Sequence, residues 1–362
     1  MTRAVEALIN LRALSHNLQC VRENAPDSQL LAVIKANAYG HGLLRVAHAL
    51  RDADAFAVAS LDEALVLREA GVKHRIVLLE GVFDCDELLL ASQQGLTIVV
   101  HHAMQLQMLE TYQLVSPLDV WLKIDTGMHR LGFAPEQVQS CYQRLEQCKS
   151  VATPICLLTH LANADDRQDD LTPRQVECFH DAVEGLNAEH SIANSAGILA
   201  WPQTHFNEHS SWVRPGIMLY GVSPFVDSLG EEHKLQAVMT LRSRLIAVSH
   251  RKAGETLGYG ASWRCPIDMP VGVVAVGYGD GYPYHAPSGT PMLVNGQCAP
   301  LVGRVSMDMI CVDLRGCDNA EIGSEVVLWG DGLPVEEVAR AAGTIPYELL
   351  CGITARVPMI EC

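Results

Sequence analysis

The stretch that decides the fold is LAVIKANAYGHG, residues 31–42. Four apolar residues run directly into Lys35, and a turn containing glycine, tyrosine and histidine follows. A short apolar run of this kind is typical of a buried parallel strand. A lysine at the end of such a strand is partly desolvated, which suits an amine that forms Schiff bases. The alternative is a lysine that only extends its charge into water.

Seven further strand-like runs follow in the first 220 residues, separated by amphipathic stretches such as LDEALVLREAG (61–71). The eight predicted strands are residues 30–36, 55–59, 75–79, 96–101, 120–125, 155–160, 191–194 and 213–220. This alternation predicts parallel strands joined by crossovers, and eight repeats fit an N-terminal (β/α)8 TIM barrel over residues 10–229. An open doubly wound sheet is the alternative, weakened because no GxGxxG turn follows the first strand.

The pattern changes after residue 229. Strand-like runs now lie close together between glycine and proline turns, as in VGVVAVGYGDGYP (271–283) and TPMLVNGQCAPLVG (290–303). VEEVARAAG (335–343) is the clearest helical stretch in this part. We therefore predict a C-terminal, mostly antiparallel β domain over residues 230–362, and we expect a strand within residues 1–9 to join it.

Composition excludes several classes of protein. The length of 362 residues and the 49% hydrophobic content are typical of a folded protein. The net charge of −16 disfavours binding to nucleic acid and to anionic membranes. The N-terminus MTRAVEALINLRALSHN carries charges throughout, and no window approaches a membrane span, so we expect the cytoplasm. The 12 cysteines form no CxxC pair, which predicts reduced thiols and no metal site.

Polar residues stand at the ends of the later predicted strands: Lys123 and Arg130, His160, Asn194 and Ser195, and Arg214 with Gly216 and Ile217. In a barrel all these ends meet at one mouth, where active sites of this fold lie. The loops after the seventh and eighth strands often bind phosphate there. In the second domain, tyrosines 259, 278 and 347 are candidate bases, although such tyrosines are more often packing residues.

Taken together, these segments resemble the bacterial alanine racemases along essentially the whole chain. The resemblance rests on AVIKANAYGHG, KIDTGMHRLGF, NSAGI, RPGIMLYG, LGYG, VGYGDGYP, VGRVSMDMI and IPYELL, in this order and spacing. It implies a pyridoxal 5'-phosphate (PLP) enzyme of fold-type III that interconverts L- and D-alanine with two bases. It also implies a head-to-tail homodimer with shared active sites, which supplies D-alanine for peptidoglycan or degrades it.

The resemblance also implies a role for individual residues. Lys35 would carry the cofactor and act as one base, and Tyr259 would be the other base, in the partner's site. Arg130 and the Met307 backbone would bind the substrate carboxylate, and carbamylated Lys123 would pair bidentately with Arg130. The remaining assignments are Arg214 on the pyridine nitrogen, His160 beside the cofactor, Tyr39, Asn194, Ser195, Gly216, Ile217 and Tyr347 as further cofactor-binding residues, and Tyr278 and Asp308 as supporting residues.

One position departs from the family: Tyr284 stands where these enzymes commonly have an arginine at the substrate entrance. This departure leaves open a broader-specificity amino-acid racemase. Three rival functions also stay open. A PLP-dependent amino-acid decarboxylase shares this two-domain plan but usually pairs the pyridine nitrogen with an acid. A PLP-binding carrier resembles the barrel alone, and a barrel enzyme could use Lys35 without PLP.

Overall fold

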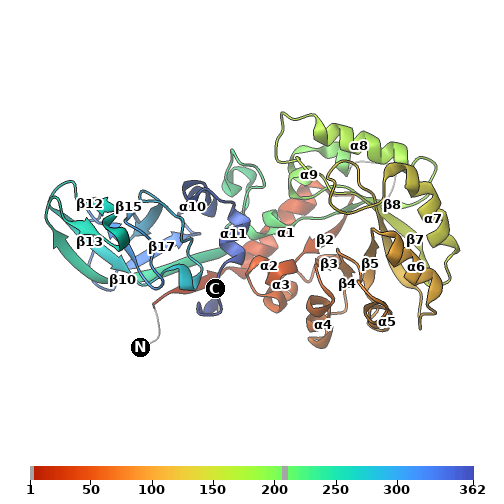
Figure 1. The fold of residues 1–362 in the computed structure, drawn as a ribbon, viewed down its shortest axis with the longest axis horizontal. Coiled ribbons are helices and arrows are strands. Elements are labelled where there is room, and N and C mark those ends of the chain that lie inside the picture. Colours follow the sequence, from red (N-terminus) through yellow and green to blue (C-terminus); the bar gives the residue numbers. More distant parts are fainter. Residues whose placement is uncertain (1–3, 206–210) are drawn as a thin grey trace.

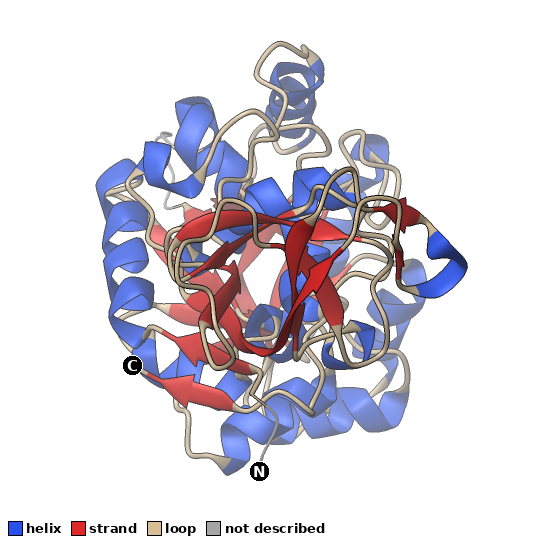
Figure 2. Cartoon of the chain, turned by 90° about the vertical axis from the view of Figure 1, so that its left-hand side faces the viewer, coloured by secondary structure: helices blue, strands red, loops and turns tan. Residues whose placement is uncertain are grey.

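The chain forms two lobes that lie end to end (Figure 1), and the computed structural model describes residues 4–205 and 211–362. One lobe is a ring of parallel strands surrounded by helices. The other is a mostly antiparallel sheet with α10 and α11 between it and the barrel. The predicted fold class is therefore confirmed. Viewed along the long axis, helices surround the strands (Figure 2).

The barrel sheet has the order β8-β7-β6-β5-β4-β3-β2-β9. Isolated parallel bridges, His190 to Ser211 and Asn194 to Arg214, span the last gap between its ends. Its strands are β2 (Gln29–Val33), β3 (Ala55–Val58), β4 (Arg75–Leu78), β5 (Thr97–Val100), β6 (Leu118–Lys123), β7 (Val151–Leu158), β8 (Glu189–Ser191) and β9 (Trp212–Val213). Its helices are α1 (Leu11–Asn24), α2 (Lys35–Tyr39), α3 (Leu43–Ala49), α4 (Leu61–Glu69), α5 (Cys85–Gln93), α6 (Ala103–Thr111), α7 (Val138–Gln147), α8 (Leu171–Ala182) and α9 (Ser195–Ala200).

All eight predicted strands exist, although their limits differ. Strands β3 and β5 are buried along their whole length, as expected where helices cover one face and the barrel interior the other. The predicted strand 191–194 is β8, which ends at Ser191. The predicted strand 213–220 stops at Val213, because Pro215 cannot donate to the ladder, and the 3₁₀ turn η3 (Ile217–Tyr220) follows.

The second sheet has the order β13-β16-β15-β14-β17-β10-β1-β18. Its strands, with the short β11–β12 hairpin, are β1 (Glu6–Ile9), β10 (Met239–Arg251), β11 (Thr256–Leu257), β12 (Trp263–Arg264), β13 (Met269–Val274), β14 (Pro291–Val294), β15 (Gln297–Val302), β16 (Ile310–Asp313), β17 (Glu325–Trp329) and β18 (Met359–Glu361). The helices of this part are α10 (Val335–Ala342) and α11 (Pro346–Cys351).

The expected N-terminal strand is β1, which pairs antiparallel with β10 and parallel with β18. Residues 1–3 of that expectation lie outside the described residues. The boundary between residues 229 and 230 stays a prediction, since β9 ends at Val213 and β10 begins at Met239.

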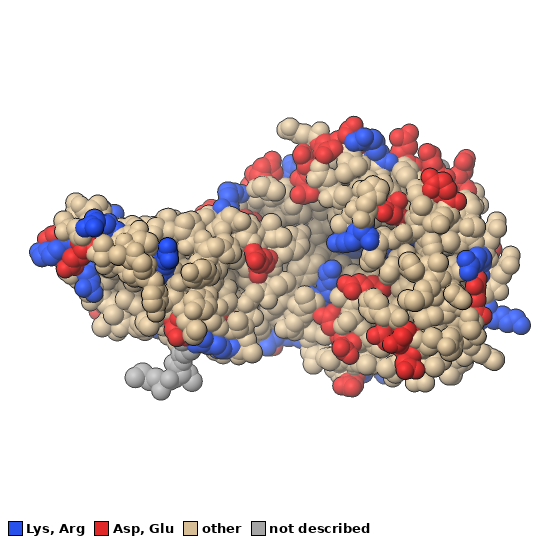
Figure 3. Space-filling view, in the orientation of Figure 1, with Lys and Arg blue, Asp and Glu red and all other residues tan. Residues whose placement is uncertain are grey.

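On the face shown in Figure 3, groups of acidic side chains are scattered over the barrel lobe and outnumber the basic ones, in keeping with the net charge of −16. The surface is hollowed where the two lobes meet (Figure 3). Within residues 4–205 and 211–362, none of the helices combines the length and the apolar content that a membrane crossing requires.

Candidate active site

A cavity of about 1030 Å³ lies at the carboxyl ends of the barrel strands, where α10 and α11 of the other lobe border it. This volume is ample for a cofactor together with a small substrate. The predicted site residues that line the cavity are Lys35, Tyr39, Lys123, Arg130, His160, Asn194, Ser195, Arg214, Gly216, Ile217 and Tyr347. The structure therefore brings together the residues that sequence analysis assigned to the barrel mouth, and Tyr347 joins them from α11.

The turn that follows Lys35 is left-handed. Four consecutive residues that are not glycine, 36–39, have φ values between 52° and 54°. Each such residue costs roughly 1–2 kcal/mol, so a run of four needs support from its surroundings. Glu63 accepts a hydrogen bond from the Asn37 amide at 3.2 Å, and the Asn37 side chain accepts one from the Leu43 amide at 2.8 Å. The turn is thus held on both sides.

Tyr39 is the last residue of this turn, and the glycine that follows it, Gly40, allows a close contact with α11. Gly40 has φ +81°, and a Cβ there would lie 2.1 Å from the Leu350 carbonyl oxygen. A glycine at this position therefore lets α11 approach the turn. The Tyr39 ring stacks on Tyr220 at 4.7 Å and lies 6.0 Å from the ring of Tyr347.

The other wall of this end of the cavity comes from the loops after β8 and β9. Ser195 Oγ accepts hydrogen bonds from the Gly216 amide at 2.9 Å and the Met218 amide at 3.4 Å. A Cβ on Gly216 would lie 2.6 Å from the Tyr39 hydroxyl, so glycine keeps this space open. Burial raises the pKa of Tyr39 and raises the pKa of Tyr347 to about 12. Both phenols therefore stay neutral and can donate hydrogen bonds to an anion.

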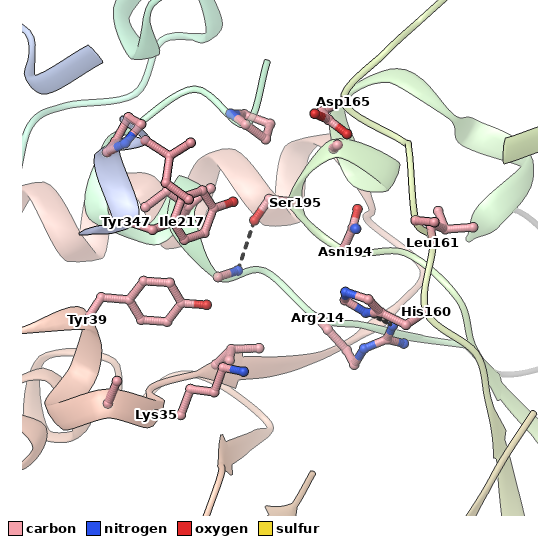
Figure 4. Close-up of a pocket in the computed structure, with 18 of the residues that line it drawn as sticks. Lys35, Tyr39, His160, Leu161, Asp165, Asn194, Ser195, Arg214, Ile217 and Tyr347 are labelled. Atoms are coloured by element: carbon pink, nitrogen blue, oxygen red, sulfur yellow. Dashed lines mark hydrogen bonds between the residues drawn. The ribbon is translucent and has the colours of Figure 1, made fainter. Parts of the chain in front are cut away.

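The opposite side of the cavity is cationic (Figure 4). The guanidinium of Arg214 is buried and donates to Ser191 Oγ and the Thr159 carbonyl, each at 2.7 Å. It also lies 3.3 Å from Nδ1 of His160. Burial lowers the pKa of Arg214 to about 10, so it stays protonated near neutral pH. Burial, and next the charge of Arg214, hold the pKa of His160 well below its usual range, so this imidazole is neutral.

Lys123 lies among these cations. Burial, followed by the charges of Arg214, Arg130 and Lys35, lowers its pKa to about 8. Positive groups gathered in a buried site are costly unless an anion neutralises them. The hydrogen-bond partners of Arg214 are neutral hydroxyl, carbonyl and imidazole groups, so its countercharge has to come from elsewhere.

These residues fit PLP. The amine of Lys35 lies in the cavity between the two ends (Figure 4), neutral donors and a glycine surround the space at one end, and a buried guanidinium stands at the other. A phosphate group and a substrate carboxylate would supply the missing negative charge.

Four predicted site residues do not line this cavity: Tyr259, Tyr278, Met307 and Asp308 belong to the second lobe. Tyr259 is 72% exposed, and Met307 is 52% exposed. Asp308 pairs with Arg356 at 2.5 Å. The structure therefore does not bring these four residues together with Lys35 of the same chain.

Sequence analysis missed the residues that support the site. Tyr220, the tyrosine of RPGIMLYG, stacks on Tyr39 and donates a hydrogen bond to the Val33 carbonyl, and no pattern in the sequence predicts this role. Glu63 lies three residues after Ser60, a spacing that reads as an ordinary helix cap. Its carboxylate instead accepts hydrogen bonds from the amides of Ala59 and Asn37. The Ser60–Glu63 spacing predicts a helix cap, but it does not predict the contact between Glu63 and Asn37.

The fold and this cavity define a class of protein, the PLP-dependent enzymes built on a barrel with a lysine at the mouth of the first strand. Two family models match the chain: "Alanine racemase, N-terminal domain" over residues 9–224 and "Alanine racemase, C-terminal domain" over residues 238–361. The chain therefore belongs to the alanine racemase family, as the resemblance implied.

Comparisons with individual proteins lead to the same family. The chain is 55% identical to the alanine racemase of Nitrosococcus oceani over 98% of both chains. It is 45% identical, with a TM-score of 0.96 and full coverage of both chains, to the structure of biosynthetic alanine racemase from Pseudomonas aeruginosa. The alanine racemase of Bartonella henselae, 28% identical with a TM-score of 0.89 over 99% of both chains, was solved with covalently bound pyridoxal phosphate. The predicted enzyme class, alanine racemase, and the predicted cofactor, PLP, are confirmed for this family, which decides against the decarboxylase and the carrier.

Proposed function

We propose that this chain interconverts L- and D-alanine with PLP attached to Lys35, using Lys35 and Tyr259 as the two bases. The observation that supports this most strongly is the cavity itself. It gathers Lys35, the neutral donors around Ser195 and the guanidinium of Arg214, whose hydrogen-bond partners among the described residues are neutral groups, at one barrel mouth. PLP needs an amine, a site for its phosphate and a partner for its ring nitrogen, and here that partner would be the protonated Arg214.

Each wall of the cavity has a proposed task. Tyr39, Tyr347 and Ser195 hold the phosphate with the backbone of Gly216 and Ile217, and Asn194 fixes this loop by accepting the Gly197 amide at 2.9 Å. Arg214 contacts the pyridine nitrogen and, because it stays protonated, offers that nitrogen a hydrogen bond without accepting its proton. His160 lies beside the cofactor and helps to fix Arg214.

When bound, PLP withdraws electrons from the α-carbon of the amino acid and so acidifies its C–H bond. The protein then has to move protons on two faces. Lys35 Nζ removes or returns the proton at Cα on one face, and Tyr259 Oη does so on the other. One base alone would return each proton to the face that it left. Arg130 and the Met307 backbone bind the substrate carboxylate, and Lys123, as a carbamate, orients Arg130.

We propose a head-to-tail homodimer in which Tyr259 and Met307 of each subunit complete the cavity of the other. Two facts support it: these residues do not line the cavity of their own chain, and their side chains are exposed. Tyr278 and Asp308 support the same surface. An exposed group of tyrosine and methionine is typical of an interface.

Three further assignments are part of the proposal. The barrel domain comprises residues 10–229, and the second domain comprises residues 230–362 with the N-terminal strand. The enzyme works in the cytoplasm. It acts in the biosynthetic direction, since the Pseudomonas aeruginosa structure carries that description. Rescue of a D-alanine-requiring bacterial strain by the expressed chain tests this last point.

A broader specificity for amino acids is a second candidate function. Tyr284 is 61% exposed and packs edge-on against Tyr278 at 5.6 Å. Two neutral rings therefore stand together on the surface proposed to reach the partner's site. Without a cation at this point, anionic amino acids are steered less strongly to the entrance, and larger amino acids meet less discrimination there.

Chiral analysis tests the main proposal. Purified protein with PLP is incubated with L-alanine, and the appearance of D-alanine is followed to equilibrium. The Lys35→Ala variant should lose the activity and the covalent attachment of the cofactor. Tyr259→Phe should keep the attached cofactor but lose most of the activity. Full activity of either variant would refute the two-base assignment, and a panel of other L-amino acids measures the breadth of specificity.

A further inference from the structure

One end of α11 contacts the turn that carries the catalytic lysine. We call residues 35–42 the lysine turn. Its Gly40 has no room for a Cβ, because that atom would lie 2.1 Å from the carbonyl oxygen of Leu350. The side chain of Cys351 lines the cavity from the same end of the helix. A displacement of the lysine turn therefore has to displace α11 as well.

The residues just after α11 contact a second turn in the same way. We call residues 277–281 the tyrosine turn, because it carries Tyr278. A Cβ on its Gly281 would lie 2.3 Å from the carbonyl oxygen of Gly352. Thr354 Oγ1 donates to the Gly279 carbonyl at 2.9 Å, and the Thr354 amide donates to the Asp280 carbonyl at 3.3 Å.

The tyrosine turn is bonded in turn to residues 306–309, which we call the methionine turn. The Gly279 amide donates to the Met307 carbonyl at 2.9 Å, and the Tyr278 amide donates to the Ser306 carbonyl at 3.1 Å. Backbone hydrogen bonds therefore join the two turns directly.

Arg356 bridges the tyrosine turn and the methionine turn. Its guanidinium bonds Asp308 of the methionine turn at 2.5 Å and lies 3.5 Å from the carboxylate of Asp280 in the tyrosine turn. Asp280 is buried, and it also accepts the Gly277 amide at 3.0 Å. A planar guanidinium that bridges two carboxylates fixes their relative position as a single ammonium group cannot.

We propose that residues 346–356 couple the lysine turn to the methionine turn, with Arg356 as the positioning residue that fixes the substrate-carboxylate contact of Met307. The proposal rests on the proposed function, in which the Met307 backbone grips the carboxylate in the partner's cavity. Binding of PLP at one lysine turn then orders the surface that the same chain offers to its partner, so the two sites of a dimer are linked through this segment.

Variants of the intact enzyme test the coupling. In Arg356→Ala, KM for alanine and the inhibition constant of propionate, a carboxylate without the amine, should each rise about tenfold, while kcat and the affinity for PLP stay near the wild-type values. Arg356→Lys should recover part of the loss. The matched control is Arg315→Ala: Arg315 pairs with Asp313 at 2.6 Å and is 41% exposed, against 40% for Arg356, but Arg315 belongs to neither turn.

Hydrogen exchange gives a readout that does not depend on activity. In the wild type, addition of PLP should slow exchange in the lysine, tyrosine and methionine turns together. In Arg356→Ala the lysine and tyrosine turns should respond as in the wild type, whereas the response of the methionine turn should be clearly smaller. The proposal is overturned if the methionine turn of Arg356→Ala responds to PLP as strongly as in the wild type, or if propionate binds this variant with the wild-type affinity. It is also overturned if Arg315→Ala shows the same losses as Arg356→Ala. A wild type that does not racemise alanine would refute the proposed function instead.

Discussion

Two inactive variants should restore activity when they form a mixed dimer, if Tyr259 serves the partner's barrel. Lys35→Ala removes the amine from the barrel, and Tyr259→Phe removes the hydroxyl from the second lobe. In the heterodimer, one cavity has Lys35 from one chain and Tyr259 from the other, and is intact. The other cavity lacks both groups. One of two sites works, so the heterodimer should have about half of the wild-type activity per dimer.

The structure sets this magnitude because Lys35 lines the cavity of its chain whereas the exposed Tyr259 does not. The variants are co-expressed with two different affinity tags, and the heterodimer is isolated by sequential purification. D-alanine formation is then compared with the wild type and with each homodimer, which should be nearly inactive.

A matched pair provides the control. Arg214 and Lys35 line the same barrel cavity, so a heterodimer of Lys35→Ala with Arg214→Ala has one defect in each cavity and should stay inactive. An inactive Lys35→Ala and Tyr259→Phe heterodimer would refute the shared site. Recovery in the control as well would refute the assignment of both residues to one barrel.

Substitutions at four single positions give four further predictions. Burial lowers the pKa of Lys123 from 10.5 to about 8, so the unfolded chain holds one more proton between these values and stability rises with pH there. Below pH 8 the folded state bears the full cost of burying the charged Lys123 ammonium. In urea titrations without CO2, Lys123→Met should therefore raise the unfolding free energy at pH 7 by up to about 3 kcal/mol. The difference between variant and wild type should vanish near pH 10.5. Gly40→Ala should lower stability by several kcal/mol and weaken PLP binding, because its Cβ meets the backbone. The control Gly71→Ala, with φ +82° and open space, should cost only about 1 kcal/mol. Arg214→Glu should lower racemisation and raise pyruvate release by transamination, because a carboxylic acid can protonate the pyridine nitrogen; flat pyruvate with continued racemisation would contradict this. Tyr284→Arg should raise the preference for alanine over serine in kcat/KM, and unchanged ratios would end the idea of a relaxed entrance.

Much of the barrel site was predictable because strand order fixes geometry. Once an apolar run is recognised as a parallel barrel strand, the residues after it must lie at the common mouth. For this reason His160 and Arg214, some 125 and 179 residues after Lys35 in the chain, were expected beside it, and they line the same cavity. The limits of the strands were less certain, because Pro215 ends β9 earlier than its apolar neighbours suggest.

The left-handed lysine turn could not be predicted. Alanine and asparagine at positions 36–38 give little sign of positive φ, and only Gly40 and Gly42 hint at an unusual path. The conformation depends on the contacts of Asn37 with Glu63 and Leu43, which only the folded chain brings together. The positions of Tyr259 and Met307 were equally inaccessible, because strand periodicity does not say which cavity an exposed loop of a second lobe will face.

The geometry of a barrel mouth gives a reason for the proposal that the second base comes from outside the barrel. Side chains at the ends of the strands and in their loops would approach a flat ligand from the barrel side and around its rim, and they include Lys35 and the residues proposed to hold the two ends of the cofactor. Racemisation needs a proton donor on the remaining face, and that group must also exclude water. In the proposed dimer, the exposed Tyr259 of one subunit would meet both needs when it lies over the cavity of the other. We infer that the two-lobed chain and the proposed two-base reaction depend on each other, since Lys35 lines the cavity of its own chain and Tyr259 does not.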